Sequence, residues 1–276
     1  MFEWHTHLCK YYNVTPDEAL KLGTRSSGRK PNLPSSITCK AVSDKTFEDI
    51  WEEKQRKSIQ EIFDFYKDQG AWSTFRQCVR HKDLEALHMS YFQLLSKNMI
   101  LKEGSHICEY GCGVAPFTTT LLKCLQDKDT NLEITLCDVD CEHFNFAKFR
   151  INSILKESGF KNIKVNFLEV KKDSLPKFEN KIDIIFCFEV LEHVPSPIAV
   201  IENFSKNTNP GSIYIENFIK HDNLTDDDDG PDLVSARKER SSYYKIVENN
   251  FNLIHPTRKD INDNPSCTKI WQRNSL

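Results

Sequence analysis

Residues 106–121, HICEYGCGVAPFTTTL, decide the fold that this sequence favours. The stretch begins as a short apolar run typical of a buried strand, and Phe117–Leu125 is typical of a helix. Between them, Gly111 and Gly113 lack the Cβ atoms that would keep a ligand away from the backbone. The spacing departs from G-x-G-x-x-G, because Ala115 is the nearest small residue after the pair. The glycines alone are therefore equally consistent with a tight strand-to-helix turn and with a nucleotide-binding loop.

The segments that follow have the spacing of an α/β fold with a doubly wound sheet. Residues 132–137 form a second β-rich run that ends in Asp138. In dinucleotide sites, an acid at the end of the second strand holds a ribose diol through two hydroxyl-to-carboxylate hydrogen bonds. Further strands are expected at residues 163–170, 182–188, 212–218, 251–255 and 268–272, and helices at 142–154, 197–205 and 232–249.

Three motifs together resemble the class I S-adenosylmethionine-dependent methyltransferases, in the branch that includes small-molecule O-methyltransferases of quinone biosynthesis. They are E-x-G-C-G at 109–113, the acid at 138, and DIIFCFEVLEHVP at 183–195. The resemblance covers about Lys102 to Arg273. It implies a Rossmann-like, doubly wound seven-stranded sheet, closed by an antiparallel pair, with residues 101–276 as the cofactor-binding domain.

The resemblance also implies S-adenosylmethionine as the cofactor, with the glycine loop under its amino-acid part and the strand-two acid on its ribose. Many relatives carry an acid after the third strand for the adenine amino group. Here that position falls near Val170 and Lys171, and Asp173 comes late, so we expect backbone atoms to contact the adenine. The cofactor-binding residues that the resemblance implies are Glu109, Tyr110, Gly111, Gly113, Asp138, Val139 and Phe188.

Residues 1–100 match no motif, and we expect them to form an N-terminal helical cap over the active site. Apolar spacing predicts helices at Thr46–Asp68 and Asp83–Asn98, joined by an aromatic-rich link. The same aromatic residues are equally consistent with a core between two helices. If the link instead forms a lid, its inner wall supplies the candidate substrate-binding residues, which are Tyr66, Trp72, Phe75 and Arg76.

Methyl transfer from a sulfonium is a direct displacement, so the protein mainly aligns the acceptor and excludes water. A hydroxyl acceptor also needs a base. His221, at the end of the fifth strand, is the first candidate, and His193 is the second because it follows the fourth strand. Glu189 is the candidate that orients the acceptor. Each histidine is also consistent with a structural or surface role.

Composition excludes several classes of partner. The chain has 276 residues, a formal charge of −3 and a pI of about 6.3, which give no general attraction to nucleic acid or to an anionic membrane. We therefore expect no nucleic-acid or membrane partner, and nothing in the sequence indicates an oligomeric state. The first residues lack the layout of a signal peptide, and the 10 cysteines include no C-x-x-C pair. We interpret them as reduced core thiols of a cytoplasmic protein.

Three features have the residue types of a metal site. They are His5, His7 and Cys9 on one face of a possible strand, the C-x-x-x-C pairs, and the acidic residues 226–229. The histidines lack a nearby fourth ligand, and a zinc ion on the cysteine pairs would displace the cofactor loop. The acidic run has the wrong register for a calcium loop. We therefore expect no metal.

The sequence favours O-methylation of a small-molecule hydroxyl, such as a sugar, another polyol or a phenol. It carries no N-P-P-Y or D-P-P-Y motif after the fourth strand and no Pro-Cys nucleophile, which nucleobase methyltransferases use. Two alternatives remain. One is N-methylation of an amine or a protein side chain, and the other is a nucleotide-binding module without catalysis.

Overall fold

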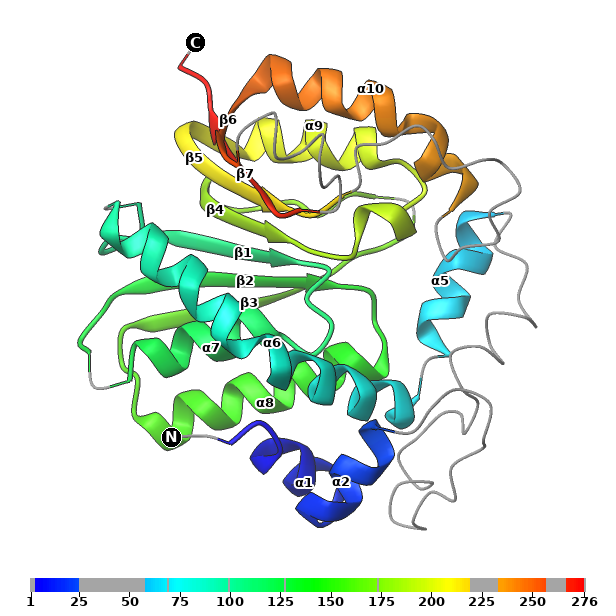
Figure 1. The fold of residues 1–276 in the computed structure, drawn as a ribbon, viewed down its shortest axis with the longest axis vertical. Helices are drawn as coiled ribbons and strands as arrows, with labels where there is room; N and C mark the ends of the chain where they lie inside the picture. The colour runs from blue at the N-terminus through cyan, green and yellow to red at the C-terminus, as the bar shows by residue number, and fades with distance from the viewer. Residues whose placement is uncertain are drawn as a thin grey trace.

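The computed structural model describes residues 3–24, 58–68, 70–98, 100–126, 128–172, 174–218, 233–256 and 267–275. These residues form a seven-stranded sheet in the order β3-β2-β1-β4-β5-β7-β6, with helices on both faces (Figure 1). The predicted fold class is therefore confirmed. The strands are β1 (His106–Tyr110), β2 (Leu132–Asp138), β3 (Ile163–Glu169), β4 (Ile182–Cys187), β5 (Thr208–Glu216), β6 (Phe251–His255) and β7 (Lys269–Arg273). The helices are α1 (Thr6–Tyr12), α2 (Pro16–Gly23), α5 (Ile59–Lys67), α6 (Ala71–Lys97), α7 (Pro116–Cys124), α8 (Glu142–Ser158), η1 (Leu191–His193), α9 (Pro197–Asn207) and α10 (Val234–Asn250).

Strand β1 lies between β2 and β4, parallel to both, and every one of its residues is buried. Ile107 pairs with Ile134 on one side and Ile184 on the other. Apolar residues are needed on both faces here, because helices cover both sides of the sheet. Strand β7 runs antiparallel to β5 and β6, as the resemblance implied. The strand order reverses between β1 and β4, and sheets of this kind bind ligands beside such a reversal, at the carboxyl ends of the strands.

Two hydrophobic cores lie on opposite faces of the sheet. One joins the strands to α6, α7 and α8, with Phe92, Leu121 and Phe144 among its buried residues. The other joins them to α9 and α10 and includes Phe204 and Tyr243. Together these cores fix the strand ends in place, so the loops beyond them are held on a rigid frame.

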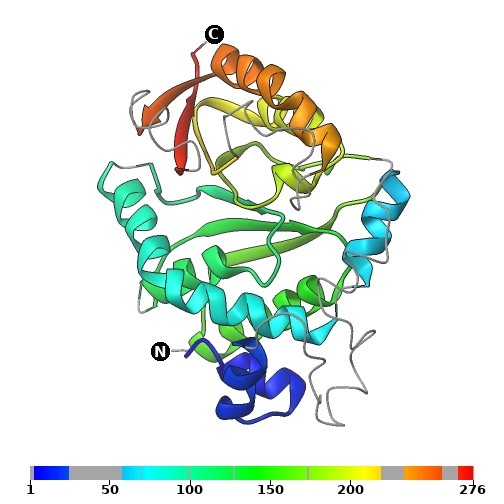
Figure 2. The ribbon, with the colours of Figure 1, turned by 45° about the vertical axis from the view of Figure 1, so that its right-hand side comes forward.

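The N-terminal helices α1 and α2 lie beneath α6 and form a third cluster with it and with α8 (Figure 2). Tyr12 is fully buried there and donates a hydrogen bond to Glu142 Oε1 at 2.7 Å. Helix α5 lies opposite the carboxyl ends of β1 and β2 (Figure 1), and its residue Ile62 packs with Leu233 and Ala236 at the start of α10. The division into a cap at 1–100 and a cofactor domain at 101–276 stays a prediction.

One expectation about the N-terminal region is wrong. The predicted link at 70–76 and the helix from Asp83 form one continuous helix of 27 residues, α6. No glycine or proline interrupts it, and Gly70 precedes it in an extended conformation that lets the helix begin there. Residues 6–9 belong to helix α1 rather than to a strand, and His7 Nε2 lies 3.1 Å from Glu157 Oε2.

Other boundaries shift by a few residues. Strand β5 begins at Thr208, earlier than expected, and its pairing with β4 is irregular between Ile182 and Ile184. Helix α5 begins after a capping box made by Ser58 and Glu61, and the part of the predicted 46–68 helix before residue 58 lies outside the described residues. Every cysteine within the described ranges is a free thiol. In those ranges, no helix is both long and apolar enough to cross a bilayer.

Candidate active site

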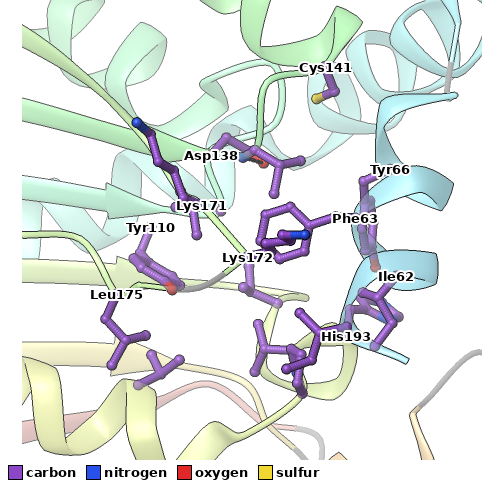
Figure 3. Close-up of a pocket in the computed structure, with 18 of the residues that line it drawn as sticks. Ile62, Phe63, Tyr66, Tyr110, Asp138, Cys141, Lys171, Lys172, Leu175 and His193 are labelled. Carbon is purple, nitrogen blue, oxygen red and sulfur yellow. Dashed lines mark hydrogen bonds between the residues drawn. The ribbon is translucent and has the colours of Figure 1, made fainter. Parts of the chain in front are cut away.

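A cavity of about 360 Å³ opens at the carboxyl ends of the strands. Figure 3 shows Asp138 on one wall and the α5 residues Ile62, Phe63 and Tyr66 on another, with His193 below them. The lining residues come from α5, α6, the loops after β1 to β4, and the first turns of α8 and α9. The cavity therefore lies beside the reversal in strand order, where ligands bind in doubly wound sheets.

The loop after β1 needs its two glycines for steric reasons. Gly111 and Gly113 have φ angles of +65° and +51°, in the region that side chains rarely adopt. A Cβ on Gly111 would lie 2.3 Å from Val190 Cγ2, and a Cβ on Gly113 would lie 2.6 Å from Gln77 Oε1. Ala115 also has a positive φ, +53°, at the start of α7. The loop thus brings bare backbone to the cavity wall, as the sequence predicted.

Glu109 supports this loop and is not among the described residues that line the cavity. Its Oε2 accepts hydrogen bonds from Thr118 N at 2.9 Å and Thr118 Oγ1 at 2.7 Å, and its Oε1 accepts one from Phe117 N at 3.2 Å. Burial raises the pKa of Glu109 to about 7, and the bonds from Thr118 and Phe117 act in the opposite direction. The carboxylate therefore caps the amino end of α7 from behind the loop.

Asp138 lies on the cavity wall at the end of β2. Its Oδ2 accepts a hydrogen bond from Gly113 N at 2.6 Å and its Oδ1 accepts one from Val139 N at 2.7 Å. A carboxylate offers about four acceptor positions, so roughly two remain for a ligand. Burial raises the pKa of Asp138 to about 6, against the effect of these two backbone bonds.

The predicted adenine edge also meets the cavity. Val139, Val170 and Lys171 line it beside Asp138, and Lys172 and Leu175 extend the same wall. Asp173 lies outside the described residues. Tyr110, buried at the end of β1, also lines the cavity, as the resemblance implied.

Glu189 and His193 both reach the cavity from the segment after β4. Glu189 has a φ of +55°, a strained value for a residue with a side chain. Asn217 holds it there in two ways: its Oδ1 accepts from Glu189 N at 2.9 Å, and its Nδ2 donates to Glu189 Oε1 at 2.5 Å. Arg80 of α6 donates to Glu189 Oε2 at 3.3 Å. No local pattern indicated Asn217 or Arg80, because their roles depend on β5 and α6 meeting the end of β4. His221 lies outside the described residues.

Of the four candidate substrate-binding residues, Tyr66 lines the cavity. Trp72 and Phe75 are buried, Phe75 within the cluster formed with α1 and α2. The guanidinium of Arg76 lies 5.5 Å from the centre of the Trp72 ring. Because 70–76 is helical, Phe75 packs against α1 and α2 instead of forming a lid wall, and Trp72 is buried and absent from the cavity lining.

Phe188 does not face the cavity either. Side chains alternate along an extended strand, so Phe186 and Phe188 pack on the α6–α8 face whereas Cys187 packs on the other. The Phe188 ring stacks on Phe117 with 4.6 Å between centroids. Phe188 can therefore contribute to cofactor binding only by supporting α7, the helix that follows the glycine loop.

The cavity contains residues that sequence reasoning did not single out as ligand contacts. Ile59, Ile62 and Phe63 were recognised as the apolar stripe of a helix, which does not distinguish a core face from a cavity wall. Gln77 and His143 join the wall next to Gly113, and they come from helices that the sequence alone could not place together. Within the described ranges, no group of three or more His, Cys, Asp or Glu side chains could hold a metal ion.

A family model described as a methyltransferase domain matches residues 101–270, more than half of the chain. The chain belongs to this family. Class I methyltransferases use S-adenosylmethionine, which is the cofactor that the motifs implied. The match contains both the glycine loop and Asp138.

The proteins that this chain resembles share little sequence identity with it. The chain is 29% identical over 137 residues to a mitochondrial ubiquinone biosynthesis O-methyltransferase of Dictyostelium discoideum, covering 47% of this chain and 41% of that protein. The chain thus spans about two fifths of that relative's length. Among solved structures, a SAM-dependent methyltransferase from Aquifex aeolicus has a TM-score of 0.44 at 19% identity, covering 66% of this chain and 87% of that one. One from Clostridium acetobutylicum has a TM-score of 0.46 at 13% identity, covering 68% and 91%.

The described residues fit the family's cofactor. The two glycines put backbone without a side chain on the cavity wall, and Asp138 keeps acceptor positions for a diol. The wall after β3 offers apolar contacts of the kind that an adenine ring needs. A charged sulfonium would find the carboxylate of Glu189 on the same cavity.

Proposed function

We propose that the protein transfers the methyl group of S-adenosylmethionine to a hydroxyl of a small molecule bound beneath α5. The observation that carries the proposal is the cavity itself. One wall has bare backbone at Gly111 and Gly113 beside the Asp138 carboxylate, and the opposite wall is apolar and belongs to α5. The first wall suits the cofactor and the second suits an acceptor.

Two features support an acceptor with apolar character. Ile62, Phe63 and Tyr66 line the α5 wall of the cavity. The curated relative from Dictyostelium is named for O-methylation in ubiquinone biosynthesis. A phenol or another hydroxyl on a compact carbon skeleton fits these features.

In this proposal, Asp138 holds the ribose, Gly111 and Gly113 admit the amino-acid part, and Glu189 orients the acceptor. Because Asn217 and Arg80 already fix the Glu189 carboxylate, it needs little reorganisation to bind an acceptor hydroxyl. His193 lines the cavity and is a candidate base. His221 remains the first candidate base from the sequence, and a cytoplasmic location also remains a prediction.

Calorimetric titration with S-adenosylmethionine and with NAD tests the cofactor. We expect binding of the first and none of the second, and the reverse result would refute the proposal. Extracts incubated with the protein and methyl-labelled cofactor then identify the acceptor by the product that gains label. His221→Ala and His193→Ala should both keep cofactor affinity, and the variant that loses about 10²- to 10⁴-fold in turnover identifies the base. Label on an amine would favour N-methylation instead.

A further inference from the structure

His143 is a buried side chain on the cavity wall that no step above uses. It is the second residue of α8, it is 5% exposed, and it lies on the same wall as Gly113 and Gln77. Its Nε2 is buried and has no hydrogen-bond partner among the described residues. A buried polar atom without a partner is unfavourable, and in a residue that lines a cavity it can be satisfied by a ligand or a water.

The neighbouring side chain determines which atom this nitrogen offers. Gln77 Nε2 lies 3.3 Å from His143 Nδ1, and an amide nitrogen can only donate. Nδ1 is therefore the acceptor, and the ring proton is on Nε2. Burial lowers the pKa of His143 to about 4, so the ring is neutral near pH 7. His143, a residue of the cavity wall, thus carries an N–H donor that finds no acceptor in the described part of the chain.

The helix that usually receives an anion in this fold is already occupied. Helix α7 begins with Pro116, which has no N–H, and the next two N–H groups bind Glu109. The following N–H, of Thr119, bonds to Ala115 O. A ligand carboxylate beside the glycine loop therefore needs donors from another element.

The cations among the described lining residues, Lys171 and Lys172, follow β3 on the adenine side of Asp138. The donors beside Gly113 are instead the neutral side chains of Gln77 and His143. His143 is in the first turn of α8, a helix of 17 residues, where the helix dipole also favours negative charge.

We infer that His143, held by Gln77, binds the amino-acid carboxylate of S-adenosylmethionine through its Nε2–H. This inference rests on the proposed function. Gln77 acts as a positioning residue: its amide sets the tautomer of His143, and its Oε1 packs against Gly113, so α6 is coupled to the cofactor loop.

The test compares two ligands that share adenosine but differ in the amino acid. S-adenosylhomocysteine carries the carboxylate, and 5′-methylthioadenosine lacks it. In His143→Met, which removes the donor at similar volume, we expect calorimetry to show S-adenosylhomocysteine bound about 10- to 100-fold more weakly, with methylthioadenosine within about twofold of wild type. His143→Gln, of similar length but with an amide donor, should regain part of the loss.

His88→Met is the matched control. His88 is also a buried histidine with an unpartnered nitrogen, but it packs on Phe117 and is not among the lining residues, so both affinities should stay unchanged. If His143→Met does not fold, Gln77→Leu replaces it, because it frees the tautomer and should selectively weaken S-adenosylhomocysteine. An equal loss for both ligands, or no loss, would overturn the inference. Failure of the wild type to bind either ligand would instead refute the proposed function, and the inference with it.

Discussion

The strongest test of the site is removal of the carboxylate at position 138. If Asp138 accepts both hydroxyls of a ribose diol, Asp138→Asn removes the charge from both hydrogen bonds and replaces one acceptor oxygen by an NH2 group that cannot accept. Each bond to a charged group contributes about 1.5–3 kcal/mol, so the loss is at most about 3–6 kcal/mol. That corresponds to a dissociation constant roughly 10²- to 10⁴-fold higher for S-adenosylhomocysteine.

The assay is calorimetric titration, with thermal unfolding as a check on folding. Asp138→Ala is the weaker variant for this purpose, because it leaves the N–H groups of both Gly113 and Val139 without an acceptor, whereas the amide oxygen of Asn can keep one of them. Asp140→Asn is the control, since Asp140 is two residues further along the same loop and is not among the described lining residues. A folded Asp138→Asn protein whose affinity falls by less than about fivefold would show that no diol is held there.

The remaining predictions concern pH, the helix cap and the glycine loop. The pKa of Asp138 is about 6, and the ionised form accepts from the ligand. Affinity for S-adenosylhomocysteine should therefore be nearly constant above about pH 7 and fall by up to about tenfold per unit below about pH 6. Calorimetry should find this dependence absent in Asp138→Asn. Glu109→Ala removes the acceptor of two backbone N–H groups and a hydroxyl, so urea unfolding should show that the free energy of unfolding falls by about 2–4 kcal/mol. The control is Glu18→Ala at an exposed helix cap, where the same quantity should fall by about 1 kcal/mol or less. In the same urea unfolding experiment, Gly111→Ala should lower the free energy of unfolding more than Gly104→Ala does. Gly111→Ala adds a clash to backbone strain, whereas Gly104→Ala, at φ +78° with open space around it, adds only strain of about 1–2 kcal/mol. Equal losses of unfolding free energy in the two variants would show that the loop has room for a side chain.

The parallel sheet and its cofactor loop could be predicted because their signals are local. Strands buried on both faces must be apolar along their length, and the turn after β1 must be glycine where φ is positive. These requirements constrain neighbouring residues, so the sequence indicated Gly111, Gly113 and Asp138 as candidates, and the structure places all three on the cavity.

The substrate wall could not be predicted in the same way. An apolar stripe on a helix has one appearance in sequence whether it meets a core or a cavity, which is why Trp72 and Phe75 were selected and Ile62 and Phe63 were not. The missing information was the continuity of α6 through 70–76, which leaves those two aromatics buried and absent from the cavity lining.

The sequence by itself determined which functional groups follow which strand. A glycine turn follows β1, an acid follows β2, and a carboxylate and a histidine follow β4. Tertiary structure alone decided that Asn217 and Arg80 fix Glu189, and that Gln77 faces His143 across the glycine loop. These pairs are 28, 109 and 66 residues apart along the chain. Hydrogen bonds over such separations depend on how helices and strands pack, and no local pattern of residues encodes them.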